Sequence, residues 1–279
     1  MDREPVALIT GTSSGFGMLT AVKLAQLGYR VVAGMRNIND KGMLLERARR
    51  VGVEASIEVV RLDVTDEETV ERVVADALTR YGELDVLVNN AGFALGGFIE
   101  ELSMDDWRRQ METNFFGLVA MTKAVLPHMR VRGSGTIVNI GSVSGRAGFP
   151  GYAPYAASKF AVEGFSESLR HEMAPYGVNV VLVEPGAYKT PIWSKGLAHI
   201  RTSADSPYAN TLQNVLNYSE RAARTAPDPQ QVADLVGRLV RVRAPRLRYA
   251  LGQGAKPMLW AKALLPWKWF ERIIRMALK

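Results

Sequence analysis

Short apolar runs alternate with stretches of helical periodicity along most of this chain. The stretches with apolar residues at helical spacing lie near residues 16–27, 41–51, 67–81, 105–132 and 154–176. Runs rich in valine and isoleucine that alternate with helices are typical of βαβ units and a buried parallel sheet. The expected strands are Val6–Thr10, Arg30–Gly34, Ile57–Leu62, Leu84–Asn89, Thr136–Ile140 and Val178–Glu184.

One domain accounts for most of the chain. A length of 279 residues suits a single large α/β domain, which we expect to span residues 1–252. Residues 187–227 interrupt the alternation with segments that contain proline and serine, and so long an irregular insertion is usually functional or mobile. We interpret this insertion as a substrate lid, with an ordinary surface loop as the alternative. Residues 253–279 form a C-terminal tail.

Composition excludes several kinds of site. The chain has no cysteine, and its three histidines show no metal-binding spacing, so we expect neither a thiol nucleophile nor a metal site. The segment Arg243–Lys279 has a net charge of +8, whereas residues 1–242 sum to −1, so a basic body suited to nucleic acid is missing. The N-terminus does not resemble a signal peptide, and no apolar run is long enough to span a membrane. We therefore expect a cytoplasmic protein.

A glycine-rich turn follows the first expected strand. Gly11, Gly15 and Gly17 lie in the sequence Thr-Gly-Thr-Ser-Ser-Gly-Phe-Gly that begins at Thr10. Glycine permits a tight turn, lets backbone N–H groups approach a pyrophosphate and allows close packing of helix on sheet. The N-terminus of the following helix favours an anion. This position favours dinucleotide binding over a simple tight turn.

Tyr155 and Lys159 are four residues apart in an expected helix, so they lie on one helical face. A tyrosine with its usual pKa near 10 is a slow acid–base catalyst at neutral pH, and a nearby ammonium lowers that pKa. Ser142, at the end of a strand, can donate a hydrogen bond to a substrate carbonyl oxygen. The Tyr–Lys spacing arises often by chance, so its meaning depends on the cofactor site around it.

The chain carries six motifs in sequence order: the Gly-xxx-Gly-x-Gly turn, Asn89-Asn90-Ala91-Gly92, Asn114, Ser142, Tyr155-xxx-Lys159 and Pro185-Gly186. Together these motifs resemble those of the short-chain dehydrogenase/reductase family. The resemblance is strong from about residue 5 to 190, weaker through residue 251 and absent from the tail. It implies a Rossmann-type doubly wound sheet of about seven parallel strands, and a homodimer or homotetramer formed through the helices near 105–132 and 154–176.

The same resemblance implies roles for individual residues. Asn114 looks like the asparagine that kinks its helix and holds a water molecule near Lys159, and it joins Ser142, Tyr155 and Lys159 in the expected catalytic set. Asp63 looks like the residue that contacts adenine, with a turn residue before the next helix as the alternative. The expected cofactor-binding residues are Gly11, Ser13, Ser14, Gly15, Phe16, Gly17, Arg36, Asp63, Val64, Asn90, Ala91, Gly92, Tyr155, Lys159, Pro185, Gly186 and Thr190.

Arg36, just after the second expected strand, indicates the cofactor. Folds that bind NAD tend to place an acidic residue here for the ribose 2′-hydroxyl, whereas an arginine accommodates a 2′-phosphate. Met35 occupies the position where NAD-dependent members of the family carry the acid, and a guanidinium can hold phosphate through two hydrogen bonds. We therefore expect NADP(H), with a solvated surface arginine as the alternative.

These residues together predict an NADP(H)-dependent oxidoreductase that interconverts a hydrophobic ketone or aldehyde and its alcohol, with Tyr155 as general acid and base. The alternative is an NADP-binding regulator or scaffold without turnover. The chain is most similar to the hydroxysteroid and retinol dehydrogenase-like branch, which implies a small apolar substrate. The side chains expected near the pocket mouth are Phe93, Leu95, Phe149, Tyr152, Tyr188 and Trp193.

The tail from Trp260 to Lys279 combines basic residues with aromatic ones. Phe270, Ile273, Ile274 and Ala277 fall on one helical face, with basic residues around it. A basic amphipathic helix with tryptophans suits a membrane surface. Docking on the protein's own domain or on a partner subunit is the alternative that the sequence leaves open.

Overall fold

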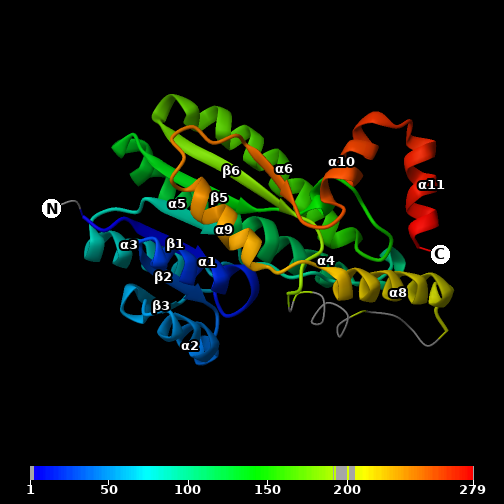
Figure 1. Cartoon of the computed structure of the whole chain (residues 1–279), viewed down its shortest axis with the longest axis horizontal. Coiled ribbons are helices and arrows are strands. Elements are labelled where there is room, and N and C mark those ends of the chain that lie inside the picture. The colour runs from blue at the N-terminus through cyan, green and yellow to red at the C-terminus, as the bar shows by residue number, and fades with distance from the viewer. Residues whose placement is uncertain (1–2, 191, 193–199, 201–204, 279) are drawn as a thin grey trace.

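Parallel strands in the order β3-β2-β1-β4-β5-β6-β7 form the central sheet (Figure 1). The computed structural model describes residues 3–190, 192, 200 and 205–278. Within these residues the sheet has seven strands, which confirms the predicted doubly wound fold. The strands are β1 (Val6–Thr10), β2 (Arg30–Met35), β3 (Ile57–Arg61), β4 (Val86–Asn89), β5 (Gly135–Ile140), β6 (Val178–Pro185) and β7 (Arg248–Leu251).

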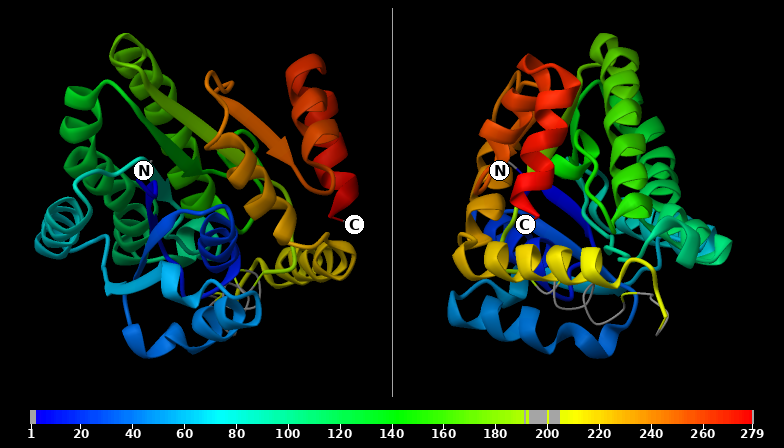
Figure 2. Two further views of the ribbon diagram at one scale, coloured as in Figure 1. Left: turned by 60° about the vertical axis from the view of Figure 1, so that its left-hand side comes forward. Right: turned by 90° about the vertical axis from the view of Figure 1, so that its right-hand side faces the viewer.

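Helices cover both faces of the sheet (Figure 2). On one face α1 (Gly15–Gln26), α2 (Gly42–Arg50) and α9 (Gln230–Leu239) enclose one apolar core. On the other face α3 (Glu67–Tyr81), α5 (Gly117–Arg132) and α6 (Ala153–Met173) enclose a second. Because the central strands are buried on both sides, they appear in the sequence as continuous apolar runs.

The long helix expected over residues 105–132 is interrupted. It consists of α4 (Met104–Met111), a π-helical turn at Glu112–Phe116 and α5. Single π-turns inside α-helices are frequent at functional sites. Asn114 lies in this turn and is buried, so the structure agrees with the helix interruption that the resemblance implied.

The expected irregular insertion contains regular structure. Residues Ala209–Thr225 form α8, a helix of 17 residues, so the prediction that residues 187–227 are irregular throughout was wrong. The prolines at both ends of this segment hid the helix, although Leu212, Val215 and Ser219 have helical spacing. The short, half-buried strand β7 and helix α9 were also missed as separate elements.

The tail forms two helices instead of one. They are α10 (Ala255–Leu264) and α11 (Trp267–Ala277), separated at Leu265-Pro266. Pro266 cannot donate the backbone hydrogen bond that a continuous helix would need there. The pair lies beside β7, at the end of the molecule opposite the N-terminus (Figures 1 and 2). No helix among the described residues is long and apolar enough to cross a membrane.

Candidate active site

The strand order reverses between β1 and β4, and this point locates the candidate site. In open parallel sheets, ligands bind beyond the carboxyl ends of the strands where the order reverses. The glycine-rich turn follows β1, the Asn90–Gly92 segment follows β4, Ser142 follows β5 and Gly186 follows β6. The fold therefore brings the residues of four sequence motifs to one edge of the sheet.

The turn after β1 is packed so closely that it requires glycine. A Cβ atom at Gly17 would lie 2.3 Å from the Gly11 carbonyl oxygen and 2.4 Å from Asn90 Nδ2, so only glycine fits there. Gly11 and Gly15 have positive φ angles of 70° and 58°. Ser14 begins α1 without a side-chain capping bond, and the first turn has no acidic residue. Thr12 N–H donates to the Gly34 carbonyl oxygen at 3.0 Å, whereas the N–H groups of the first turn of α1 have no side-chain cap and are available to an anion, so the residues present fit a dinucleotide.

Two threonines that the sequence analysis did not assign to the site hold the turn in place. Thr10 Oγ1 accepts hydrogen bonds from the backbone N–H groups of Asn90 (3.0 Å) and Ala91 (2.9 Å). Thr12 Oγ1 donates to the Gly34 carbonyl oxygen at 3.0 Å. Asn90 Nδ2 in turn donates to the carbonyl oxygens of Thr10 and Gly11. The sequence signal that could have identified Thr10 and Thr12 was their position inside the glycine-rich motif.

The side chains of Met35 and Arg36, at the end of β2, lie in different environments. Met35 is buried at 1 % exposure in the core beneath α1, whereas Arg36 is exposed. No hydrogen bond or ion pair joins Arg36 to another described residue. Its guanidinium is therefore available at the edge of the expected ribose position, and Met35 is not.

Asp63 serves the turn before α3. Its Oδ1 accepts hydrogen bonds from Thr65 N (3.1 Å) and Thr65 Oγ1 (2.8 Å), which is the turn role that the sequence left open. Val64 beside it is buried and would meet a Cβ at Gly117 at 2.6 Å. Contact of Asp63 with adenine stays a prediction.

The remaining expected cofactor residues lie at the same edge. Gly186, after the last residue of β6, donates its N–H to the Leu251 carbonyl oxygen at 2.8 Å. Thr190 donates its N–H to the Tyr188 carbonyl oxygen at 2.8 Å, which forms a tight turn. A Cβ at Gly92 would lie 3.0 Å from Asn114 Oδ1, so this glycine allows the β4 loop to approach the π-turn. Ser13, Ser14, Phe16 and Pro185 complete the set, and all but Pro185 are partly exposed.

Tyr155, Lys159 and Ser142 converge beyond the end of β5. Lys159 is buried at 6 % exposure and donates from Nζ to the Ile140 carbonyl oxygen at 2.8 Å, while its Nζ lies 5.8 Å from the centre of the Tyr155 ring. Ser142 is buried and accepts a hydrogen bond from Ser144 N at 3.1 Å. The phenol, the ammonium and the hydroxyl therefore share one small site.

The pKa values of the pair differ from the expectation. Burial raises the pKa of Tyr155 above its usual 10, and a hydrogen bond with Ser142 opposes this rise. Burial lowers the pKa of Lys159 to about 8. The pKa of Tyr155 is thus raised in this structure, and not lowered as expected, because desolvation outweighs the hydrogen bond with Ser142.

Asn114 links three parts of the site. Its Nδ2 donates to the Phe93 carbonyl oxygen (2.9 Å) and to Ser158 Oγ (3.1 Å), and its Oδ1 accepts from Phe93 N (3.0 Å). Ser158 Oγ donates in turn to the Tyr155 carbonyl oxygen at 2.7 Å. The fully buried Gln110 of α4 holds the loop after β4, because its Nε2 donates to the Phe93 carbonyl oxygen and its Oε1 accepts from Leu95 N. Ser158 and Gln110 were missed, because a polar residue on the inner face of a helix has no distinctive spacing.

One residue expected near the pocket mouth belongs to the core. Tyr188 is 1 % exposed, its ring meets Phe16 edge to face at 5.5 Å, and its hydroxyl donates to Gln231 at 3.2 Å. Gly252 allows this position, since a Cβ there would lie 2.6 Å from the Tyr188 ring. The prediction of Tyr188 as a mouth residue was therefore wrong. Trp193 lies outside the described residues.

Two of the other expected pocket residues, Phe149 and Tyr152, contact α8. Phe149 stacks on Tyr218 with ring centres 6.1 Å apart, and Phe98 stacks on Tyr208 at 4.4 Å. Tyr152 is buried and its side chain bonds to Ser219, while Leu95 is buried and Phe93 is partly exposed beneath the Arg109 guanidinium. Helix α8 therefore covers the loops that follow β4 and β5. Among the described residues no group of His, Asp and Glu side chains could hold a metal ion.

Comparison with known proteins agrees with this geometry. The family model of the short chain dehydrogenases matches residues 5–200. The uncharacterized oxidoreductase YusZ of Bacillus subtilis is 44 % identical over 278 residues, with 99 % of both chains covered. Retinol dehydrogenase 8 of Bos taurus is 36 % identical, covering 95 % of this chain and 87 % of its own. The 17-beta-hydroxysteroid dehydrogenase type 1 of Mus musculus is 38 % identical, covering 88 % and 72 %.

Solved structures share the whole architecture. A short-chain dehydrogenase from Streptomyces avermitilis superposes with a TM-score of 0.82 at 35 % identity, covering 99 % of this chain and 98 % of its own. A Burkholderia phymatum enzyme in complex with NAD gives 0.77 at 29 % identity, with 88 % of each covered. Actinorhodin polyketide ketoreductase with NADPH gives 0.75 at 34 % identity, covering 89 % and 95 %. The chain is therefore an oxidoreductase of the short-chain dehydrogenase/reductase family.

Proposed function

We propose that this protein is an NADP(H)-dependent oxidoreductase that interconverts an apolar ketone or aldehyde and its alcohol. The observation that carries the proposal is the convergence of Ser142, Tyr155 and Lys159 at the strand ends beside a glycine turn that only glycine can form. A protein that only binds a dinucleotide has no need of a proton donor and an oxygen-binding hydroxyl at this place.

Arg36 supports NADP(H) over NAD(H). The guanidinium is exposed at the end of β2 and free to hold a 2′-phosphate through two charge-assisted hydrogen bonds. Met35 has its side chain in the core, so it offers neither a carboxylate nor any polar group to the ribose hydroxyls. The relatives include proteins solved with NAD and with NADPH, so the preference rests on this chain's own residues.

The proposed chemistry is a balanced two-electron reduction. When bound, the reduced nicotinamide supplies a hydride to the carbonyl carbon. Ser142 donates a hydrogen bond to the carbonyl oxygen, on which negative charge develops, and Tyr155 transfers its phenolic proton to that oxygen to give the alcohol. Lys159 is held by the Ile140 carbonyl group near the phenol, where its positive charge stabilises the phenolate that remains.

Asn114 acts as a positioning residue in this proposal. It connects the Phe93 backbone to Ser158, and Ser158 fixes the Tyr155 backbone. The loop after β4 and the catalytic helix are thereby kept in register. The water molecule expected near Asn114 stays a prediction.

The substrate end of the site supports an apolar ligand. Phe98, in the loop after β4, stacks on Tyr208, the residue before α8, and Phe149, in the loop after β5, stacks on Tyr218 of α8. We propose that residues 187–227, which include α8, form the substrate lid. The family relatives retinol dehydrogenase 8 and 17-beta-hydroxysteroid dehydrogenase type 1 carry names of apolar substrates, which agrees with this proposal. A cytoplasmic location, a homodimer or homotetramer formed through α5 and α6, and peripheral contact of the tail with a membrane are also proposed.

A parallel assay tests the reaction class and the cofactor together. The purified protein is mixed with NADPH or NADH and a panel of aliphatic, aromatic and steroidal ketones and aldehydes, and the loss of absorbance of the reduced nicotinamide is followed. We expect turnover with NADPH on apolar members of the panel and none in Tyr155→Phe. Tight NADPH binding without turnover on any compound would support a regulator or scaffold instead.

A further inference from the structure

The tail carries large apolar side chains that the fold leaves in solvent. Three tryptophans are 63–69 % exposed, which is unusual for residues that otherwise bury a large apolar area. They lie on α10, on α11 or on the residues next to the turn between these helices. The exposed apolar set is Trp260 (69 %), Leu264 (74 %), Leu265 (38 %), Trp267 (65 %), Trp269 (63 %), Ile273 (39 %) and Met276 (57 %).

These side chains occupy a second apolar face, different from the one that packs inward. On α11 the buried Phe270 and the partly buried Ile274 and Ala277 mark the inward face, which is most of the face that the sequence analysis considered for lipid. Trp269, Ile273 and Met276 follow one another at spacings of four and three residues, so they share a different face that points outward. Most of the face through Phe270 that the sequence singled out therefore packs inward, as in the docking alternative that the sequence left open.

Helix α10 repeats this division between an inward and an outward face. Ala255 and Leu259 are buried, whereas Trp260 and Leu264, four residues apart, are exposed. Two outward apolar faces on consecutive helices need a reason besides folding, because neither contributes to the cores of the domain.

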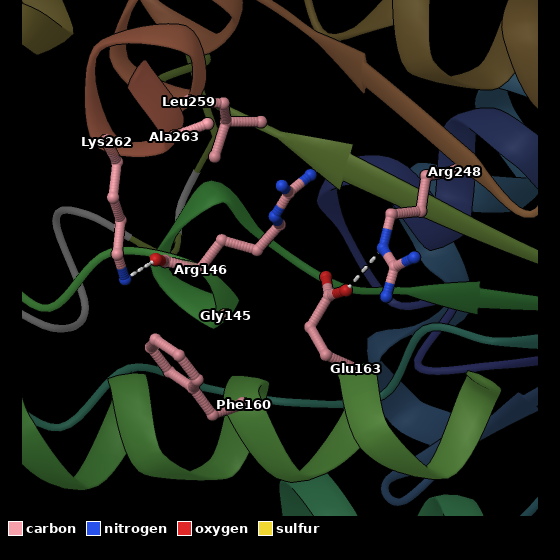
Figure 3. A pocket seen from close by; sticks show the side chains of 8 residues that line it. All are labelled: Gly145, Arg146, Phe160, Glu163, Arg248, Leu259, Lys262 and Ala263. Carbon is pink, nitrogen blue, oxygen red and sulfur yellow. Dashed lines mark hydrogen bonds and ion pairs between the residues drawn. The ribbon is translucent and has the colours of Figure 1, made fainter. Parts of the chain in front are cut away.

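The pair of helices is anchored on the catalytic domain. Lys262 donates from Nζ to the Arg146 carbonyl oxygen and lies over the Phe160 ring of α6 at 5.1 Å (Figure 3). Leu259 of α10 and Phe160 of α6 line one small pocket between the tail and the domain (Figure 3). Arg221 of α8 also donates a hydrogen bond to the Ala277 carbonyl oxygen at 3.5 Å. The outward faces are thus held in a fixed place relative to the domain.

The charges around the exposed apolar set are almost all positive. Between Ala255 and Leu278 the only acid is Glu271, and Arg275 pairs with it at 2.6 Å. Lys256, Lys268 and Arg272 form no ion pair with another described residue. Apolar and tryptophan side chains ringed by cations match the boundary between the acyl chains and the headgroups of an anionic lipid surface.

We propose that the α10–α11 pair docks this protein on an anionic lipid surface, with the exposed apolar set inserted at the headgroup boundary and the surrounding lysines and arginines on the lipid phosphates. A second copy of the chain fits less well. A two-fold contact through the same patch would bring Lys256, Lys268 and Arg272, which have no acidic partner among the described residues, near the same three cations of the second copy, so the charges would repel. The proposal does not depend on the oxidoreductase activity.

Vesicle sedimentation with the full-length protein tests the proposal. The probes are vesicles of phosphatidylcholine alone and of phosphatidylcholine mixed with phosphatidylserine, at low and high salt. We expect binding to the mixed vesicles, weakening with salt, and a blue shift of the tryptophan emission. Failure of the wild-type protein to bind the anionic vesicles would overturn the proposal, whatever its activity on carbonyl compounds.

Two variants identify the residues responsible. Trp260→Ser with Leu264→Ser and Trp269→Ser removes outward side chains but leaves Trp267, whose ring packs 5.8 Å from the buried Phe270. We expect the vesicle partition coefficient to fall about tenfold or more, and Lys268→Glu with Arg272→Glu to lower it similarly at low salt. The matched control is Met43→Ser with Ile99→Ser and Val131→Ser, three apolar residues with 60–80 % exposure elsewhere on the chain.

The readings separate a lipid surface from a protein partner. Circular dichroism melts establish that each variant is folded, and the control triple variant should bind vesicles like the wild type. Vesicle binding that the tail variants leave unchanged would refute the proposal. A second pattern would also refute it. In that pattern the wild-type protein does not bind vesicles but forms a dimer without lipid in sedimentation velocity, and the tail triple variant is a monomer.

Discussion

Glu163 offers a sharp test of the electrostatics inside this fold. Its side chain is 9 % exposed on α6, and its Oε2 accepts a hydrogen bond from Arg248 Nε at 2.9 Å. Glu184, 1 % exposed near the end of β6, lies beside it. Burial and then repulsion by Glu184 raise the pKa of Glu163 from 4.5 to about 7, despite the attraction of Arg248.

This pKa sets the sign of a stability change with pH. Below the unfolded-state pKa the carboxyl group is protonated in both states, and its contribution to stability is complete. As the pH rises through about 7, the unfolded chain has already released its proton and the folded chain must ionise a buried group, so that contribution is lost. The two pKa values correspond to about 3 kcal/mol of unfolding free energy, as an upper limit because Glu163 and Glu184 titrate together.

The perturbation is Glu163→Gln, which is neutral at every pH and keeps an oxygen that accepts from Arg248. Urea unfolding followed by circular dichroism gives the unfolding free energies of variant and wild type at about pH 5 and about pH 8. We expect the variant to gain up to about 3 kcal/mol relative to the wild type between the two pH values. Glu167→Gln is the control, because Glu167 pairs with the same Arg248 but is 52 % exposed, and its effect should stay below about 1 kcal/mol. A variant that follows the wild type at both pH values would refute the reasoning.

Three further changes test the proposed site. Tyr155→Phe should lower kcat by about 10²- to 10⁴-fold and leave NADPH binding, measured by fluorescence titration, nearly unchanged; activity near wild type would exclude the phenol as proton donor. Gly17→Ala should weaken dinucleotide binding about tenfold or more and destabilise the fold by about 1–3 kcal/mol, because its Cβ would meet the Gly11 carbonyl oxygen at 2.3 Å, whereas Gly42→Ala, with open space around it, should do neither. Arg36→Ala should raise the Kd of NADPH about tenfold or more and hardly change that of NADH; equal losses for both cofactors would count against a 2′-phosphate role.

Residue patterns predicted the fold where one physical effect determines the outcome. Strands buried on both faces must be apolar throughout, so β1, β2, β4, β5 and β6 were readable as runs. Strand β7 was not, because it is half-buried at the sheet edge and carries Arg248. Helix α8 was hidden by flanking prolines, since turn-forming residues indicate where an element ends but not whether one lies between them.

In the candidate site, residue spacing predicted which side chains lie together, but it did not predict their protonation or exposure. A separation of four residues determines that Tyr155 and Lys159 share a helical face, and the structure agrees. The pKa of each group depends instead on how many polar atoms surround it in three dimensions, and that is decided by distant segments such as the β5 end that supplies the Ile140 carbonyl group. The burial of Tyr188 also depends on a distant residue. This tyrosine lies near the expected nicotinamide position in the sequence, but it is a core residue because Gly252, 64 positions later, leaves space for its ring. Chemical type and spacing therefore predict which residues can act together, whereas protonation and exposure follow only from the packed fold.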